Sequence, residues 1–181
     1  MPRVAIRRPT MRDEPRFLAA AQRSRRLHSH FVYPPRTPQA FRALLRRARQ
    51  AAHEHRLIVE AQSRDLVGVA NLNEIVRGSF QSAYLGYYAF VPLAGKGLMR
   101  EGLSLVLRLA FRELGLHRVE ANIQPDNARS IVLARSLGFR REGYSPRYLK
   151  LGGRWRDHER WTLLREEWRP RGHGREGPAG G

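Results

Sequence analysis

The sequence predicts an α/β (α+β) fold: a central mixed, mostly antiparallel sheet of about seven strands, flanked by about four helices. The chain has 181 residues, of which 41% are hydrophobic, and this is enough for one domain with its own core. Strand-like segments that follow one another through short turns predict antiparallel hairpins. One strand–helix–strand unit predicts a parallel pair. We therefore expect a mixed sheet with helices on its faces.

The first half of the chain predicts a short strand, two helices and a hairpin. Thr37 and Pro38 indicate the start of the second helix, because threonine is a favoured N-cap and proline is favoured at the first helical position. Apolar residues then recur at helical spacing, so this helix is expected to run to about His55. The expected elements are a strand at 4–6, a helix that opens at Asp13 and Glu14, the helix from 38 to about 55, and hairpin strands at 57–61 and 66–72 around the polar turn 62–65.

The second half alternates strands and helices and ends in a hairpin. The segment 98–114 is apolar over most of its circumference, which predicts a largely buried helix. Gly115 and Gly138 are placed to end the two helices of this half. The expected elements are a strand at 83–91, the buried helix, a strand at 118–123, a helix at 127–137, and strands near 148–151 and 160–164 joined by the turn 152–153.

Residues 1–169 are expected to form the one domain. Residues 170–181 are expected to be a disordered tail, because they are rich in glycine and have nothing to bury. The sequence shows no signal peptide and no run long enough to span a membrane, so we expect a soluble, cytoplasmic protein. Without cysteine, the chain has no cysteine nucleophile and no thiolate metal site. The seven histidines show no metal-ligand spacing, so we expect no metal.

Charge is the most unusual feature of the composition. Lysine and arginine number 34 against 16 acidic residues, which gives a net charge of +18. A charge of this size attracts polyanions such as RNA, a ribosome surface or a phosphorylated cofactor. The arginine cluster at 23–26 and the Arg-rich helix from Arg42 to Arg49 would then help the protein dock on ribosomal RNA or an acidic partner. The alternative is a solvated basic face.

A glycine turn between a strand and the buried helix is the main candidate for ligand binding. Gly95 and Gly97 allow close approach of a ligand and positive φ angles, and the first amides of the following helix are unpaired. With Lys96 between them, these groups suit a diphosphate. The alternative is an ordinary turn. The pattern is neither a P-loop nor the dinucleotide fingerprint, because it lacks the residues that end those motifs.

Three blocks in order make the chain similar to the GNAT acyl-CoA N-acyltransferases, and within them to the RimJ/RimL branch. The first is the G-x-G of Gly95 and Gly97, with Pro92 where the family usually has glutamine or arginine. The second is the N-x-x-S of Asn127 and Ser130, and the third is the G-x-W-x-D-H of 153–158. The similarity covers about residues 4 to 168. Enzymes of this branch acetylate the N-terminal amine of ribosomal proteins.

The resemblance implies a GNAT fold, acetyl-CoA as co-substrate and a set of residues that bind it. It places a carbonyl-polarising backbone amide at Phe90 and Val91, where the fourth strand splays from the fifth. It assigns Asn127 to the pantetheine arm. The cofactor-binding residues that it implies are Phe90, Val91, Leu93, Ala94, Gly95, Lys96, Gly97, Leu98, Met99, Asn127 and Ser130.

Acyl transfer from a thioester to an amine needs no covalent intermediate, which suits a chain without cysteine. The resemblance makes Ser130 the first candidate for a hydrogen bond to the cofactor sulfur. Tyr148 and Tyr144 are rival proton donors. The alternative for Ser130 is a helix-start residue that bonds backbone amides, and Asn127 can likewise be an N-cap.

Glu120 is the candidate general base. Val119, Ala121 and Ile123 alternate on one face of their strand, so Glu120 and Asn122 share the other face, where the carboxylate can take a proton directly or through water. The alternative is a solvated strand glutamate. A second acid found in related enzymes is replaced here by Arg147. For Asp157 and His158 we favour a structural role, in a turn anchored by Trp155 and Asp157.

The function that follows is transfer of acetyl from acetyl-CoA to the N-terminal α-amine of a protein. A ribosomal protein that begins with alanine is the expected acceptor. One alternative is a small amine, such as an aminoglycoside or polyamine, although the sites for such cations are usually acidic. Another is a non-enzymatic module that binds acyl-CoA or RNA at the ribosome.

Overall fold

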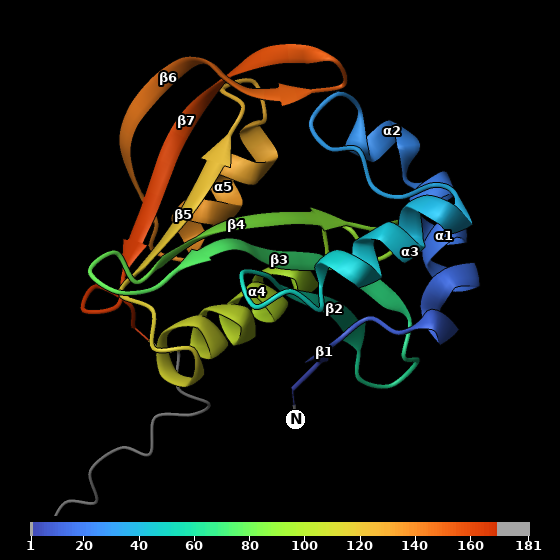
Figure 1. Cartoon of the computed structure of the whole chain (residues 1–181). Coiled ribbons are helices and arrows are strands. Elements are labelled where there is room, and N and C mark those ends of the chain that lie inside the picture. Colours follow the sequence, from blue (N-terminus) through green and yellow to red (C-terminus); the bar gives the residue numbers. More distant parts are fainter. Residues whose placement is uncertain (1, 170–181) are drawn as a thin grey trace, which may run out of the picture.

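The computed structural model describes residues 2–169, so the predicted tail at 170–181 lies outside the described residues. Seven strands form one sheet in the order β1-β2-β3-β4-β5-β7-β6 (Figure 1). Only the β4–β5 pair is parallel, and the other five pairs are antiparallel. The predicted mixed, mostly antiparallel sheet is confirmed.

The strands are β1 (Val4–Arg7), β2 (Glu54–Glu60), β3 (Leu66–Val76), β4 (Ser82–Ala89), β5 (Arg118–Ile123), β6 (Arg140–Leu151) and β7 (Arg154–Leu164). The helices are α1 (Glu14–Arg23), α2 (Arg25–His28), α3 (Pro38–Arg47), α4 (Leu98–Arg108) and α5 (Ala128–Ser136). A short 3-10 turn (Met11–Asp13) precedes α1, and a π-helical segment (Leu109–Glu113) continues α4.

Two helices begin where their N-cap residues predict. The side chain of Thr37 accepts a hydrogen bond from the Ala40 amide, and that of Asn127 accepts one from the Ser130 amide, each at 3.2 Å. The predicted end of the second helix is wrong, because α3 ends at Arg47 and His55 lies in β2. The apolar residues at helical spacing end at Ala52, and the chain from Glu54 onward pairs with β3 instead of continuing the helix.

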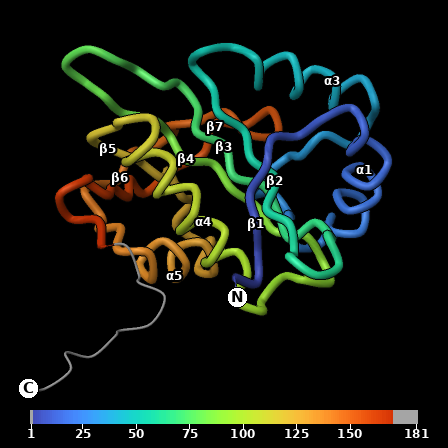
Figure 2. Tube along the Cα trace, turned by 90° about the horizontal axis from the view of Figure 1, so that it is seen from below, coloured from blue at the N-terminus to red at the C-terminus, as the bar shows by residue number. Residues whose placement is uncertain are grey.

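The sheet separates two layers of helices, which Figure 2 shows from below with α4 and α5 on one side and α1 and α3 on the other. The first layer packs on an apolar core that includes Leu103, Val106 and Val119. The second layer packs on a smaller core built around Phe17, Phe41 and Phe90. We call these the α4 face and the α1 face of the sheet.

The parallel pair β4–β5 is short, and this opens the sheet. Its register runs only from Ser82 opposite Arg118 to Tyr84 opposite Glu120. Beyond that point the two strands diverge, as Figure 1 shows. We call this separation of the two strands the opening, and it lies in the middle of the sheet, between the fourth and fifth strands in its order.

The last two strands are much longer than the predicted segments at 148–151 and 160–164. They pair from Arg140 opposite Thr162 to Leu151 opposite Arg154, with two register shifts in between. The sequence hid this length because β6 is an edge strand, mostly exposed and rich in charged residues, so it carries little apolar alternation. The predicted turn at Gly152 and Gly153 is confirmed, with φ angles of 57° and 79°.

Candidate active site

The glycine turn before α4 is open on its outer side. Gly95, Lys96 and Gly97 are exposed, and the two glycines have φ angles of 83° and 79°. A Cβ atom added at Gly95 would meet nothing within 4 Å. No side chain caps α4, so its first amides have no intrahelical partner. These features suit a bound diphosphate.

The other predicted residues around this turn contribute backbone rather than side chains. The side chains of Leu93, Leu98 and Met99 belong to the core on the α4 face. Ala94 lies within the turn, where its amide donates to the Phe90 carbonyl at 3.0 Å. A ligand at this turn would therefore be held by main-chain amides and by Lys96.

The amides of Phe90 and Val91 are not free, contrary to expectation. The Phe90 amide donates to the Val67 carbonyl at 2.8 Å, and the Val91 amide donates to the hydroxyl oxygen of Ser24 at 3.0 Å. Amides alternate between the two edges of a strand, so the Ala89 amide points away from β3 and toward the opening beside β5. Ala89 is therefore the better position for a polarising amide.

Two buried residues of the α1–α2 junction hold this end of β4, and neither was predicted from the sequence. Ser24 and His28 are 1% and 2% exposed and lie one helical turn apart. Ser24 bonds the Val91 amide, and His28 donates from Nε2 to the Ala89 carbonyl at 2.8 Å. Burial lowers the pKa of His28, which favours its neutral form. No local motif marks these residues, because their partners are more than sixty positions away.

Ser130 is held against β4 by a third residue that the sequence did not predict, Tyr87. The Ser130 hydroxyl donates to the Tyr87 phenol oxygen at 2.8 Å, and the phenol donates to the Ser130 carbonyl at 3.1 Å. Burial raises the pKa of Tyr87 to about 12, so the phenol keeps its proton at neutral pH. The N-cap role of Asn127 is confirmed by its bond to the Ser130 amide. Both residues stand on the α4 side, near the opening.

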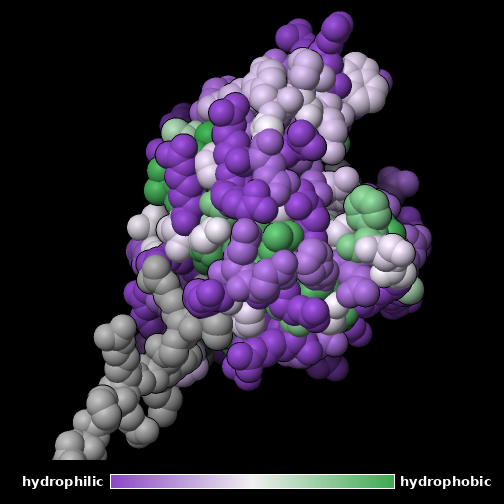
Figure 3. All heavy atoms as spheres, turned by 90° about the vertical axis from the view of Figure 1, so that its left-hand side faces the viewer, coloured by the Kyte–Doolittle hydropathy of each residue, from purple (hydrophilic) through white to green (hydrophobic). Residues whose placement is uncertain are grey.

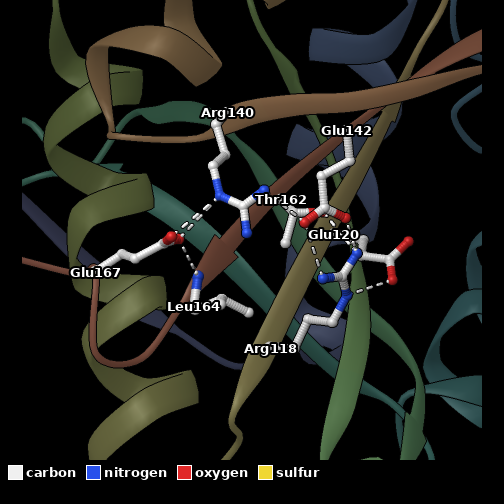
Figure 4. Close-up of polar contacts among 7 residues, drawn as sticks. All are labelled: Arg118, Glu120, Arg140, Glu142, Thr162, Leu164 and Glu167. Carbon is white, nitrogen blue, oxygen red and sulfur yellow. Dashed lines mark hydrogen bonds and ion pairs between the residues drawn. The ribbon is translucent and has the colours of Figure 1, made fainter.

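Glu120 belongs to a charged network on three strands, shown in Figure 4. Arg118 donates from Nε to Oε1 of Glu120 at 2.7 Å, and from Nη2 to the Thr162 hydroxyl at 2.8 Å. Arg118 also pairs with Glu142, and this hydrogen bond lowers the pKa of Glu142 to about 2. Glu120 is therefore not the solvated strand glutamate that the sequence left as the alternative. Its carboxylate is oriented by Arg118, and Oε2 is left for another partner.

Tyr148 lies on the same face as Glu120. Its phenol interacts with that of Tyr84, which raises the pKa of Tyr84. Tyr84 is in turn the register partner of Glu120. The Tyr148 ring also lies 6.2 Å from the ring of His158. Of the two rival tyrosines, Tyr148 is therefore the one that the fold brings toward Glu120.

Tyr144 forms a hydrogen bond with the side chain of Asp157 rather than with Glu120. The Tyr144 hydroxyl and the Arg147 amide both donate to Asp157, the latter at 2.7 Å. These bonds hold the irregular part of β6, which agrees with the structural role expected for Asp157. Trp155 does not anchor this turn from within, because it is 59% exposed.

The segment that follows α2 contacts both the residues just after β5 and the β6–β7 turn. Gln124, just beyond β5, donates from Nε2 to the His30 carbonyl at 3.3 Å, and His30 bonds Asp126 at 2.9 Å. Tyr33 touches the β6–β7 turn so closely that a Cβ atom at Gly152 would overlap its hydroxyl. The α1 side of the opening is thus framed by α2, this segment and the β6–β7 hairpin.

The arginine-rich surfaces are exposed, as expected. Arg23, Arg25 and Arg26 are exposed around the α1–α2 junction. On α3, Arg42 lies 3.5 Å from Glu14, and the Arg47 guanidinium lies 3.0 Å from Glu74. Figure 3 shows that the side of the molecule formed by the β6–β7 half is also mostly hydrophilic.

Within residues 2–169, no group of three or more histidine, aspartate or glutamate side chains is placed to hold a metal ion. Within the same residues, no helix is long and apolar enough to cross a membrane.

Comparison with known proteins agrees with this architecture. A family model described as an acetyltransferase (GNAT) domain matches residues 3–140. The chain is 42% identical over 113 residues to the ribosomal protein uS5-alanine N-acetyltransferase of Escherichia coli (strain K12). This match covers 62% of the chain and 58% of the relative, so it spans less than two thirds of that protein.

Two further comparisons bear on the ligand and the acceptor. The solved structure of Mycobacterium smegmatis RimJ in complex with CoA-disulfide has a TM-score of 0.81 at 26% identity, over 91% of this chain and 83% of that one. The spermidine N(1)-acetyltransferase of Vibrio cholerae is 27% identical over 115 residues, which cover 64% of this chain and 66% of that protein.

Proposed function

The chain belongs to the GNAT acetyltransferase family, and we propose that it transfers acetyl from acetyl-CoA to the N-terminal α-amine of a protein. A ribosomal protein that begins with alanine is the proposed acceptor. The 42% identity to a uS5-alanine N-acetyltransferase supports this choice. So does the similarity to RimJ, whose structure holds a CoA derivative.

The observation that carries the proposal is the opening between β4 and β5. The glycine turn leads into α4, and Ser130 bonds Tyr87, which packs on the core of the α4 face. Glu120 points to the opposite face of β5 from the core residues Val119 and Ala121, and Tyr148 adjoins its register partner Tyr84. A thioester bound from one side and an amine bound from the other would meet in this opening. Holding two reactants in this way converts a bimolecular step into an effectively unimolecular one.

The fit to acetyl-CoA rests on the groups that the chain supplies. The amides of Gly97, Leu98 and Met99, with Lys96, would hold the diphosphate. Bound acetyl-CoA supplies the activated acetyl group. The Ala89 amide would stabilise negative charge on the carbonyl oxygen, a contribution of roughly 3 kcal/mol for one such donor.

Proton transfers are assigned to residues on both sides. Glu120 would accept the proton of the amine, directly or through water, and Arg118 would hold its carboxylate in place. Tyr148 would donate a proton or hydrogen bond to the leaving sulfur, or Ser130 would do so by turning its hydroxyl away from Tyr87, to which it donates in this structure. The demand on the base is mild for an α-amine, whose unperturbed pKa is about 8, against about 10.4 for lysine.

A polyamine is the second candidate acceptor, and the similarity to a spermidine N(1)-acetyltransferase favours it. The charge of the chain opposes it. A polycation gains from a net negative site, whereas this protein carries +18 and its candidate base is already paired with Arg118.

The exposed arginines of the α1–α2 junction and α3 would support docking on ribosomal RNA or on an acidic partner. They lie on the α1 side, from which the acceptor would approach. Binding of this kind should weaken steeply as salt rises, because it releases counterions from the nucleic acid.

The experiment is the release of CoA thiol from acetyl-CoA in the presence of matched peptides. One peptide carries a free N-terminal alanine, and the other has a blocked N-terminus and a free lysine. Spermine is the third acceptor. Thiol release only with the free N-terminus supports the proposal, and release only with spermine contradicts it. Tight binding of acetyl-CoA by calorimetry without release to any amine would point to a non-enzymatic binding module.

A further inference from the structure

A solvent-exposed glycine lies in the middle of the central strand β4. Gly86 is exposed, although it is flanked by paired residues on both sides and has a φ angle that any residue can adopt. Glycine weakens a strand interior, and there it often marks a place where a ligand approaches closely. A Cβ atom at Gly86 would meet only the Asn73 side-chain nitrogen, at 3.7 Å. The space above this glycine is therefore open.

Two asparagines stand on either side of this space. Asn71 on β3 is the register partner of Gly86. Asn122 lies across the opening on β5, two residues beyond Glu120 and on the same face. The side-chain oxygens of both asparagines are buried, and among residues 2–169 neither has a hydrogen-bond partner. An unpaired buried acceptor costs about 1–3 kcal/mol, so both oxygens favour a donor from elsewhere.

A buried histidine continues this row of polar groups. His55 on β2 is the register partner of Asn71, and it is 4% exposed. Both of its ring nitrogens are buried, and neither makes a hydrogen bond of ordinary geometry among residues 2–169. His55, Asn71 and Asn122 thus line one row of the α1 face with neutral hydrogen-bonding groups, and Gly86 leaves the gap in the middle of that row.

We propose that Gly86 is the floor of the subsite for the first residue of the acceptor, and that Asn71 and Asn122 accept hydrogen bonds from the N–H groups of that residue and the next. This inference rests on the proposed function and names the specificity of its site. Amide oxygens suit an amine that must lose a proton, because they bind N–H groups without the strong preference for an ammonium ion that a second carboxylate would impose. The missing side chain at position 86 sets the room for the first residue.

The first test adds a side chain at position 86, which forms the floor of the proposed subsite. Gly86→Ala and Gly86→Val should fold, because the added Cβ atom makes only an ordinary contact and β-branched residues favour strands. With acetyl-CoA saturating, Gly86→Val should raise the KM for a peptide that begins with alanine by roughly tenfold or more, and more for one that begins with leucine. Gly86→Ala should raise the KM less than Gly86→Val does, and again more for the leucine peptide than for the alanine peptide. The Kd for acetyl-CoA should not change.

Removal of an amide tests the walls of the subsite. Asn122→Ala should raise the KM for the same peptide by roughly tenfold. Gln39→Ala is the matched control, because it removes an exposed amide from α3, away from this row. Equal KM values in wild type, Gly86→Val and Asn122→Ala would overturn the inference.

The outcome separates this inference from the proposed function. If wild type acetylates spermine and no peptide, the proposed function fails. An unchanged KM for spermine in Gly86→Val would then overturn the subsite as well, whereas a raised KM would keep Gly86 as the floor of the amine site. If wild type binds acetyl-CoA but neither binds nor acetylates any amine, both proposals fail.

Discussion

The hydroxyl of Ser130 donates a 2.8 Å hydrogen bond to the phenol of Tyr87, which joins the first turn of α5 to the middle of β4. The phenol returns a bond to the Ser130 carbonyl. The residue expected at the cofactor sulfur is thus fixed by a buried strand residue. The single proton of this hydroxyl is donated to a phenol that is itself neutral at neutral pH, so the hydroxyl must turn away from Tyr87 before it can donate to the sulfur.

Replacement of Ser130 separates a catalytic from a structural role. Ser130→Ala should lower kcat by roughly a hundredfold if the hydroxyl assists the leaving thiolate, with little change in the Kd for CoA. Ser136→Ala is the matched control, because its hydroxyl bonds only the Leu133 carbonyl at the other end of α5. Steady-state kinetics and calorimetry check both. An unchanged kcat in Ser130→Ala would leave this serine with its N-cap and Tyr87 contacts alone.

Glu120→Gln tests the proposed base through its pH dependence. We expect a fall in turnover of roughly a hundredfold at pH 7, with acetyl-CoA binding retained. The defect should shrink above about pH 8, where an α-amine loses its proton without help. Glu142→Gln is the control, because Glu142 shares the same arginine partner but is not the proposed base. Full turnover of Glu120→Gln at pH 7 would contradict the assignment.

Gly95→Ala tests the diphosphate turn. A φ angle of 83° costs a residue with a Cβ atom about 1–2 kcal/mol, so alanine should shift the turn and misplace the amides that follow it. The Kd for acetyl-CoA should rise roughly tenfold by calorimetry. Gly153→Ala is closely matched, with a φ angle of 79° and equally open surroundings, but it lies in the β6–β7 turn. Equal Kd values for the two variants would argue against the turn as the diphosphate site.

His55 should make the protein sensitive to mild acid. Burial lowers the pKa of His55 from 6.5 to about 4. Between these values the unfolded chain binds a proton that the folded protein excludes, so this contribution to stability is present above pH 6.5 and is lost as the pH falls toward 4. The loss amounts to roughly 3 kcal/mol at most.

Urea unfolding at pH 7 and pH 5 measures this loss. His55→Gln should flatten the difference in the free energy of unfolding between the two pH values, and His30→Gln, at a more exposed position, should leave it as in wild type. A pH difference in His55→Gln as large as that in wild type would show that other groups carry the acid sensitivity.

The parts of the site that could be predicted from the sequence are those whose residues lie close together along the chain. The glycine turn lies between a strand end and a helix start, and the bond from the Ser130 amide to Asn127 joins residues three positions apart. The side-by-side placement of Glu120 and Asn122 follows from the alternation of one strand. For such features, the residue types and their spacing are enough to predict the geometry.

The sequence by itself determined the order of the strands and helices, the sheet class, the glycine turn before α4 and the resemblance to the GNAT enzymes. Only the tertiary structure decided which amides at the end of β4 are occupied, because the Val91 amide bonds Ser24, 67 positions away, and the Phe90 amide bonds the Val67 carbonyl on the neighbouring strand. It likewise paired Ser130 with Tyr87 and opened the space over Gly86. Such contacts depend on how strands register and where the sheet splays, and this is set by packing among distant segments rather than by any local pattern.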